Sequence, residues 1–134
     1  MMSAMDDNIG LVLKQLRETG QDKNTLVFFI SDNGGPTMPG VTVNASRNDP
    51  LRGSKRTTLE GGIRVPFVIS WPGKITPGTY APPVIQLDLT ATALTAAGID
   101  AAAERSIEGV NLLPYLNGEK PGAPHDAQIG RAHV

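Results

Sequence analysis

The sequence predicts an α/β fold in which a sheet is covered by helices. Three segments carry this prediction: a helical stripe in residues 5–18, and apolar runs rich in β-forming residues at 25–31 and 65–71. The chain has 134 residues, 40% of them hydrophobic, which suits one small domain with a core. Because a helix precedes a non-alternating strand, we expect one αβ unit of a parallel sheet.

The first helix is predicted from apolar residues that repeat at helical spacing: Met5, Ile9, Val12, Leu13 and Leu16. Acidic residues stand in its expected first turn, and Gly20 follows at the position of a left-handed cap. Residues 25–31 then read as a strand, and the absence of alternation predicts burial on both of its faces.

Two more helices are predicted after the strand at 65–71. Residues 88–97 form a helix that Asp88 or Thr90 can cap and Gly98 can stop, with its apolar face made by Leu89, Ala93, Leu94 and Ala97. A brief helix over 110–116 is broken or entered at Pro114.

Composition excludes several classes of protein. A formal net charge of -1 gives the whole chain no electrostatic reason to bind nucleic acid or an acidic membrane. Without cysteine it has no disulfide, no thiolate zinc site and no cysteine nucleophile. No run approaches the roughly 20 apolar residues that cross a membrane. Residues 1–7 lack the basic and apolar regions of a signal peptide, and the compartment stays open.

The segment 31–35 follows the first strand and contains Asp32 and Asn33 side by side. Ligands of open α/β sheets bind at such strand ends, and carboxylate and amide oxygens suit Ca²⁺ or Mg²⁺. The alternative is a plain turn, because Asn-Gly is a strong hairpin signal. The non-alternating strand before it argues against a simple hairpin.

Residues 32–64 form a long glycine-rich and proline-rich loop without periodicity, which is uncommon unless the loop is functional. Between residues 47 and 64, five basic residues stand against two acidic ones, a local charge of +3. Such a loop can wrap an anion, with lysine as a point charge. The alternative is a solvated basic loop with ion pairs inside it. Its spacing is not that of a P-loop.

Together these segments resemble the C-terminal part of the catalytic domain of the sulfatase family, arylsulfatase-like enzymes of the alkaline-phosphatase superfamily. The matching motifs start near Met5 and continue through the ranges 32–35, 48–55, 60–67, 71–75, 86–98 and 108–114. The resemblance implies an alkaline-phosphatase-like α/β sheet covered by helices. It also implies hydrolysis of an aryl or carbohydrate sulfate ester at a divalent cation, usually Ca²⁺, with Mg²⁺ as the weaker alternative.

The resemblance also implies roles for single residues. Asp32 and Asn33 match metal ligands, and Lys55 matches the catalytic position whose ammonium binds the sulfate group. Arg52 and Arg64 are expected to form structural ion pairs. If Lys55 and Asp32 serve one substrate, the ammonium and the carboxylate lie on the order of 5 to 9 Å apart.

The sequence also departs from the family pattern. The family nucleophile is a formylglycine made from the first residue of Cys/Ser-x-Pro-x-Arg, and the nearest match, at Ser70, lacks the arginine. Two further acidic metal ligands are missing as well. We therefore expect residues 1–128 to be a partial sulfatase catalytic domain that is inactive alone. Residues 129–134 are similar to a translated sequencing adapter.

Two other functions stay open at this point. One is a phosphonate or phosphate ester hydrolase of the same superfamily, because a metal and a basic residue stabilise either tetrahedral anion. The other is a non-enzymatic module that binds anionic polysaccharide or nucleic acid through residues 47–64. That segment lacks the aromatic side chains on which bases stack.

Overall fold

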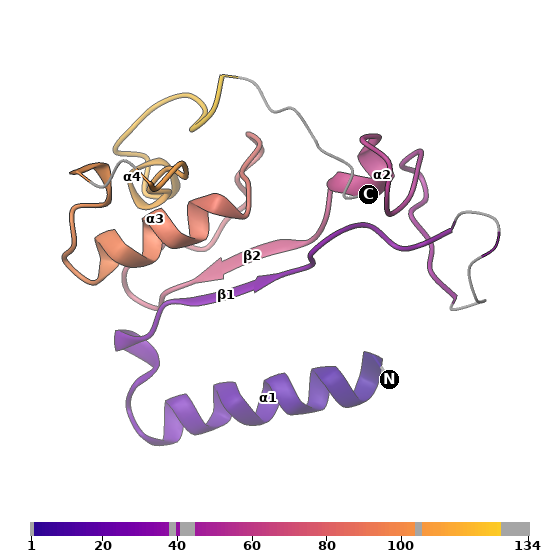
Figure 1. Ribbon diagram of the computed structural model, residues 1–134. Helices are drawn as coiled ribbons and strands as arrows, with labels where there is room; N and C mark the ends of the chain where they lie inside the picture. Colours follow the sequence, from indigo (N-terminus) through magenta and orange to yellow (C-terminus); the bar gives the residue numbers. More distant parts are fainter. Residues whose placement is uncertain (1, 38–39, 41–44, 104–105, 127–134) are drawn as a thin grey trace. The chain divides into compact units, whose positions relative to one another are not determined.

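The computed structural model describes residues 2–37, 40, 45–103 and 106–126, so the predicted adapter-like tail at 129–134 lies outside the described residues. None of the helices within these ranges is long and apolar enough to cross a membrane. The elements, labelled in Figure 1, are in chain order α1 (Met2–Glu18), the 3-10 turn η1 (Asp22–Asn24), β1 (Val27–Ile30), α2 (Glu60–Ile63), β2 (Phe67–Ser70), α3 (Leu87–Ala96), the 3-10 turn η2 (Ala101–Ala103) and α4 (Leu113–Leu116).

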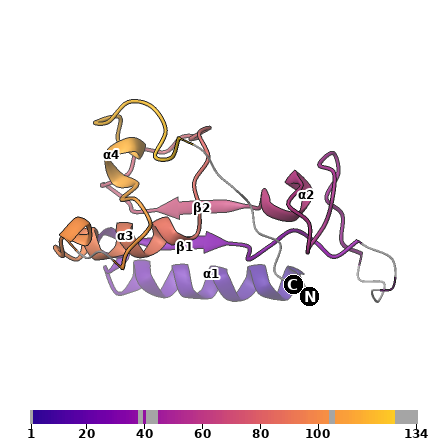
Figure 2. The same cartoon turned by 45° about the horizontal axis from the view of Figure 1, so that its top comes forward.

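β1 and β2 pair into a two-stranded sheet and run in opposite directions (Figures 1 and 2). Next to the strands, the backbone N–H of Ser31 donates to the carbonyl of Pro66 at 3.2 Å. The combination of helices and sheet confirms the predicted α/β class, but the expected parallel arrangement is wrong for these two strands. The described part of their connection contains the single turn α2 and no crossover helix, so the chain returns antiparallel.

α1 confirms the first predicted helix, although it begins at Met2 and its first turn therefore contains no acidic residue. Its C-terminal end matches the prediction. Gly20 has a φ of 69°, and the N–H of Gln21 donates to the carbonyl of Leu16 at 2.8 Å. This bond across a left-handed glycine is the Schellman arrangement that ends many helices.

Apolar burial in α1 and β1 is smaller than the sequence predicts. No residue of α1 is buried, and Val12 is 62% exposed. Phe29 in β1 is 41% exposed, so the expectation of a strand buried on both faces is wrong here. The physical reason is that a two-stranded sheet leaves much of its faces uncovered.

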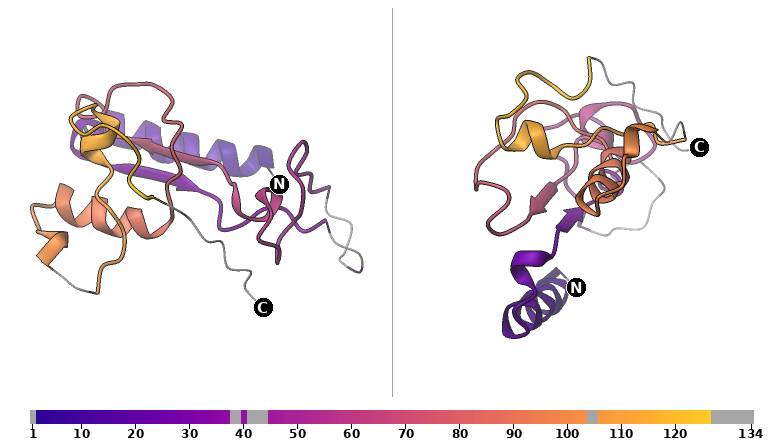
Figure 3. Two further views of the ribbon diagram at one scale, coloured as in Figure 1. Left: turned by 90° about the horizontal axis from the view of Figure 1, so that it is seen from above. Right: turned by 90° about the vertical axis from the view of Figure 1, so that its left-hand side faces the viewer.

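The chain divides into two compact units, one built from Met1–Val27 and Ile69–Pro124 and the other around Phe28–Val68. In the first unit the segment just before α4 contacts α3, the helix drawn in orange in Figures 2 and 3. The N–H of Leu112, just before α4, donates to Oγ1 of Thr92 in α3 at 3.0 Å. Both residues are almost wholly buried, so this bond ties the entry of α4 to α3 inside the core.

α3 lies within one residue of its predicted bounds and ends at Gly98, whose φ is 82°. The predicted caps are wrong, because the capping position is Gln86 and makes no side-chain cap bond. Asp88 instead lies inside the first turn, fully buried, and its carboxylate accepts the N–H groups of Ile85 and Val110 at 2.9 Å each.

The buried face of α3 also differs from the predicted one, since it consists of Asp88, Ala91 and Thr92. Small and hydrogen-bonded residues face the segment before α4, where Gly109 approaches the carbonyl of Leu87 too closely for any side chain. α4 is entered at Pro114 as predicted.

Candidate functional site

The candidate site lies in the second unit, in the turn that follows β1. Ser31 Oγ donates to the carbonyl of Asn33 at 3.0 Å, and Asn33 Nδ2 donates to the carbonyl of Gly34 at 3.0 Å. The N–H of Gly34 reaches across to the carbonyl of Gly62 at 2.9 Å. Asn33 and Gly34 therefore do not close a hairpin, so the hairpin form of the alternative is wrong, while metal binding by this turn stays a prediction.

Glycines hold the two ends of the long loop together by close backbone contact. A Cβ on Gly34 would meet the carbonyl oxygen of Gly61, and a Cβ on Gly61 would meet the carbonyl oxygen of Gly53. The N–H of Gly61 donates to the carbonyl of Arg52 at 2.7 Å. Of these glycines Gly53 has a positive φ, of 91°. The glycines at 34 and 61 thus serve close approach, not unusual backbone angles.

Lys55 stands in a tight turn that is joined to the same region. Its backbone N–H donates to the carbonyl of Gly35 at 3.3 Å. The turn is closed by Thr57, whose N–H donates to the carbonyl of Ser54 at 3.0 Å and whose Oγ1 donates to the same carbonyl at 2.8 Å. Ser54 is buried, whereas Lys55 is exposed. The backbone of Lys55 is therefore fixed while its side chain reaches solvent.

Asn48 bonds to both of these segments with its side-chain amide. Oδ1 accepts the N–H of Gly35 at 2.9 Å. Nδ2 donates to the carbonyl of Gly35 at 2.9 Å and to the carbonyl of Gly53 at 3.1 Å. Because an N–H can only donate and a carbonyl can only accept, the partners fix the orientation of the amide. All of its polar hydrogens are used.

Ion pairs account for part of the charge in this loop. Arg64 pairs with Glu60 at 2.9 Å, as expected, and Arg47 pairs with Asp49 at 3.1 Å. Both pairs are largely exposed and contribute at most about 1 kcal/mol each. Within the described residues the three remaining cations of the loop form no ion pair: Arg52, Lys55 and Arg56. The ion pair expected of Arg52 is therefore not found among these residues. The surplus positive charge therefore surrounds Lys55.

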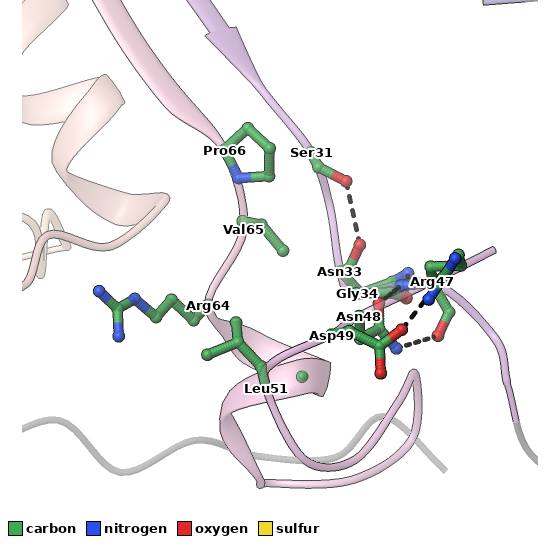
Figure 4. A pocket seen from close by; sticks show the side chains of 12 residues that line it. Ser31, Asn33, Gly34, Arg47, Asn48, Asp49, Leu51, Arg64, Val65 and Pro66 are labelled. Carbon is green, nitrogen blue, oxygen red and sulfur yellow. Dashed lines mark hydrogen bonds and ion pairs between the residues drawn. The ribbon is translucent and has the colours of Figure 1, made fainter.

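An open pocket of about 290 Å³ lies beside the turn after β1 (Figure 4). Asn33 and Asn48 line it together with Arg47 and Asp49, and the guanidinium of Arg64 points away from them. Asp32 and Lys55 are not among its lining residues. The structure thus brings Asn33 to the pocket, and it brings Lys55 to Gly35 through the backbone. The distance from the Lys55 ammonium to the Asp32 carboxylate stays a prediction.

A comparison with protein families matches residues 1–99 to the family described as Sulfatase. The chain belongs to the sulfatase family. Curated relatives agree with this: it is 35% identical to an uncharacterized sulfatase, YdeN, of Escherichia coli (strain K12), over 91% of the chain and 21% of that protein. It is 40% identical to the human N-acetylgalactosamine-6-sulfatase over 84% of the chain and 22% of that protein.

Solved structures agree on the fold. The crystal structure of Ps i-CgsB in complex with k-i-k-neocarrahexaose superposes with a TM-score of 0.79 and 34% identity, over 93% of the chain and 26% of that protein. The alkaline-phosphatase-like fold expected from the sequence is therefore confirmed for this sulfatase chain. The chain spans about a fifth of the length of the curated relatives it matches, 21% and 22%.

The metal donors in this sulfatase chain are few. Among the described residues no group of three or more His, Cys, Asp or Glu side chains could hold a metal ion. Asp32 is exposed, and Asn33 turns its Nδ2 to the carbonyl of Gly34, which leaves Oδ1 on the opposite side of the amide. These hard oxygens fit Ca²⁺, which takes six to eight of them, as part of a larger donor set.

Asn48 is the polar residue whose place in this site was missed by reasoning from the sequence. It stood within a basic, glycine-rich cluster, and its neighbours Asp49 and Pro50 are ordinary turn residues. A half-buried side chain that bonds distant backbone groups leaves no local signal, because its partners lie 13 and 5 positions away. Only its position at the start of the motif 48–55 set it apart.

Proposed function

We propose that this chain is the part of a sulfuric ester hydrolase that contributes Asp32 and Asn33 to a Ca²⁺ site and Lys55 to the binding of the sulfate group. The observation that carries the proposal is the bond from the Lys55 backbone N–H to the Gly35 carbonyl, 3.3 Å long. It joins the turn of Lys55 to the turn that contains Asp32 and Asn33. The cationic Lys55 and the proposed metal ligands Asp32 and Asn33, which are more than 20 positions apart in the sequence, therefore lie in the same compact unit.

Each side chain has a definite task in this proposal. The Lys55 ammonium donates charge-assisted hydrogen bonds to the sulfate oxygens and stabilises negative charge as the ester bond breaks. The Asp32 carboxylate and the Asn33 Oδ1 supply oxygen ligands to the cation. When bound, that cation polarises the sulfate oxygens and offsets their charge.

The surplus positive charge of the loop supports an anionic substrate. With Arg47 and Arg64 paired to acidic neighbours, Lys55 and its neighbours Arg52 and Arg56 remain as unpaired cations in the described part of the loop. A cluster of exposed cations raises the local concentration of an anionic substrate and speeds its encounter with the protein.

For the substrate we propose a carbohydrate sulfate ester. Of the similar proteins, the human one is named for N-acetylgalactosamine 6-sulfate, and the crystal structure holds a neocarrahexaose. The pocket beside Asn33 is lined by apolar residues and by charged side chains, Arg47 and Asp49, and the charged groups suit the hydroxyl groups of a sugar.

Titrations of the 134-residue chain test the site. Calorimetry with CaCl₂ should show binding that Asp32→Asn weakens on the order of tenfold or more, because a charged ligand is lost. Asp7→Asn, at an exposed carboxylate of the other unit, is the matched control and should change nothing.

A second titration, with sodium sulfate against sodium chloride of equal ionic strength, should show weaker sulfate binding for Lys55→Ala. The neighbouring Arg56→Ala is its control, since Arg56 is an exposed cation of the same turn. Equal effects of these two substitutions would reduce the loop to a diffuse basic surface and refute the role of Lys55.

A further inference from the structure

We propose that Asn48 is the positioning residue of this site, whose side-chain amide sets the turn of Lys55 against the turn of Asp32 and Asn33. The inference rests on the proposed function of those three residues. It concerns a residue with no direct contact to cation or sulfate in that proposal.

The contacts of Asn48 lie symmetrically between the two groups. Gly35, which Asn48 holds through both its N–H and its carbonyl, comes two positions after Asn33. Gly53, held through its carbonyl, comes two positions before Lys55. One amide therefore fixes the backbone close to each half of the site, and a backbone bond from Lys55 to Gly35 closes the ring of contacts.

The chemistry of the amide explains why asparagine fits this position. The carbonyl oxygens of Gly35 and Gly53 need two donors, and the N–H of Gly35 needs an acceptor. The amide of asparagine supplies both donors on Nδ2 and the acceptor on Oδ1. An aspartate of the same shape would present its second oxygen to two carbonyl oxygens, which repel it. Alanine would remove all three bonds and leave the Gly35 N–H and the Gly53 carbonyl without the amide, whereas the Gly35 carbonyl would keep the N–H of Lys55.

The arrangement predicts that Asn48 acts through Lys55. Loosening the two turns lets the ammonium leave the position that a bound sulfate requires, and catalytic constellations tolerate little such displacement. A residue that acts in this way loses its influence on sulfate affinity once the ammonium is absent. A residue that merely stabilises the fold keeps its influence.

The test is a double-mutant cycle on the 134-residue chain, with ¹⁵N amide spectra recorded during titration with sodium sulfate in the presence of CaCl₂. Asn48→Ala should weaken sulfate binding on the order of tenfold, the equivalent of losing one to two net hydrogen bonds. In the Lys55→Ala background the same substitution should add little, because the two residues act as one unit. Asn117→Ala, at an exposed asparagine of the other unit, is the matched control.

The outcomes separate this inference from the proposed function. If Lys55→Ala weakens sulfate binding while Asn48→Ala leaves it intact, the positioning role is overturned and the proposed function stands. It is also overturned if Asn48→Ala weakens binding equally in both backgrounds. If Lys55→Ala has no effect, the proposed function fails and this inference fails with it.

A second variant is used if the amide signals of Asn48→Ala are poorly dispersed, which would show that this variant does not fold. Asn48→Asp has the same size and keeps the acceptor for the Gly35 N–H, but it loses both donors. It should show the same dependence on Lys55 as the alanine variant. Sulfate affinity equal to that of the unsubstituted chain would contradict the positioning role.

Discussion

Replacing Gly34 with alanine tests whether the glycines of the loop serve close backbone approach. An added Cβ would meet the carbonyl oxygen of Gly61 and would lie 2.8 Å from the carbonyl carbon of Gly61 and 3.0 Å from the Cα of Gly62. All of these are backbone atoms, so no side-chain rotation relieves the clash. Gly34 is not among the glycines with positive φ, and the cost is therefore steric.

The magnitude follows from three contributions. Overpacking of a tight site costs about 1–3 kcal/mol. Loss of the bond from the Gly34 N–H to the Gly62 carbonyl costs about 0.5–1.5 kcal/mol. The stiffer unfolded chain returns about 0.4–1 kcal/mol. We expect Gly34→Ala to destabilise the loop by roughly 0.5–4 kcal/mol in sum.

Amide hydrogen exchange measures this effect locally. The N–H groups of Lys55 and Gly61 bond to Gly35 and Arg52, and both should exchange faster in the variant. Gly10→Ala is the control, because a Cβ at Gly10 in α1 meets nothing within 4 Å. It should stabilise the helix by about 0.5–1 kcal/mol. Unchanged exchange in Gly34→Ala, or a stabilisation like that of Gly10→Ala, would refute the reasoning.

Three further predictions concern other parts of the chain. Asp88→Ala leaves two backbone N–H groups without their acceptor and should lower the free energy of unfolding by about 2–4 kcal/mol in urea titrations, whereas the exposed Asp7→Ala should stay within about 0.5 kcal/mol. Burial raises the pKa of Tyr80 above 10.0, with a smaller contribution from the neighbouring Tyr115, so Tyr80 should ionise at a higher pH than in the unfolded chain. Its contribution to stability is present below pH 10.0 and is lost as the pH rises through the folded pKa; tyrosinate absorbance of the unsubstituted chain against Tyr80→Phe measures this, and an ordinary titration would contradict it. Finally, the purified chain should hydrolyse no aryl sulfate, because a lysine and two metal ligands do not replace a covalent nucleophile, and turnover above a blank preparation would disprove the assignment.

The sequence alone determined the features that depend on neighbouring residues. The period of the apolar residues located α1, and glycines with left-handed backbone, Gly20 and Gly98, ended α1 and α3 where expected. The entry of α4 at Pro114 has the same local origin, since proline fixes its own backbone angle. The motifs also sufficed to identify the sulfatase family, because short residue patterns around a site can be recognised in the sequence without a structure.

Only the tertiary structure decided how distant segments meet. It made β1 and β2 antiparallel, turned Asp88 from a predicted cap into a buried acceptor, and left Phe29 in β1 partly exposed. It also showed that the Gly61 carbonyl leaves no room for a side chain at position 34. It further showed that Asn48 bonds to two turns, at Gly35 and Gly53. These facts depend on contacts between residues far apart in the chain, and such contacts follow from packing that no local pattern encodes.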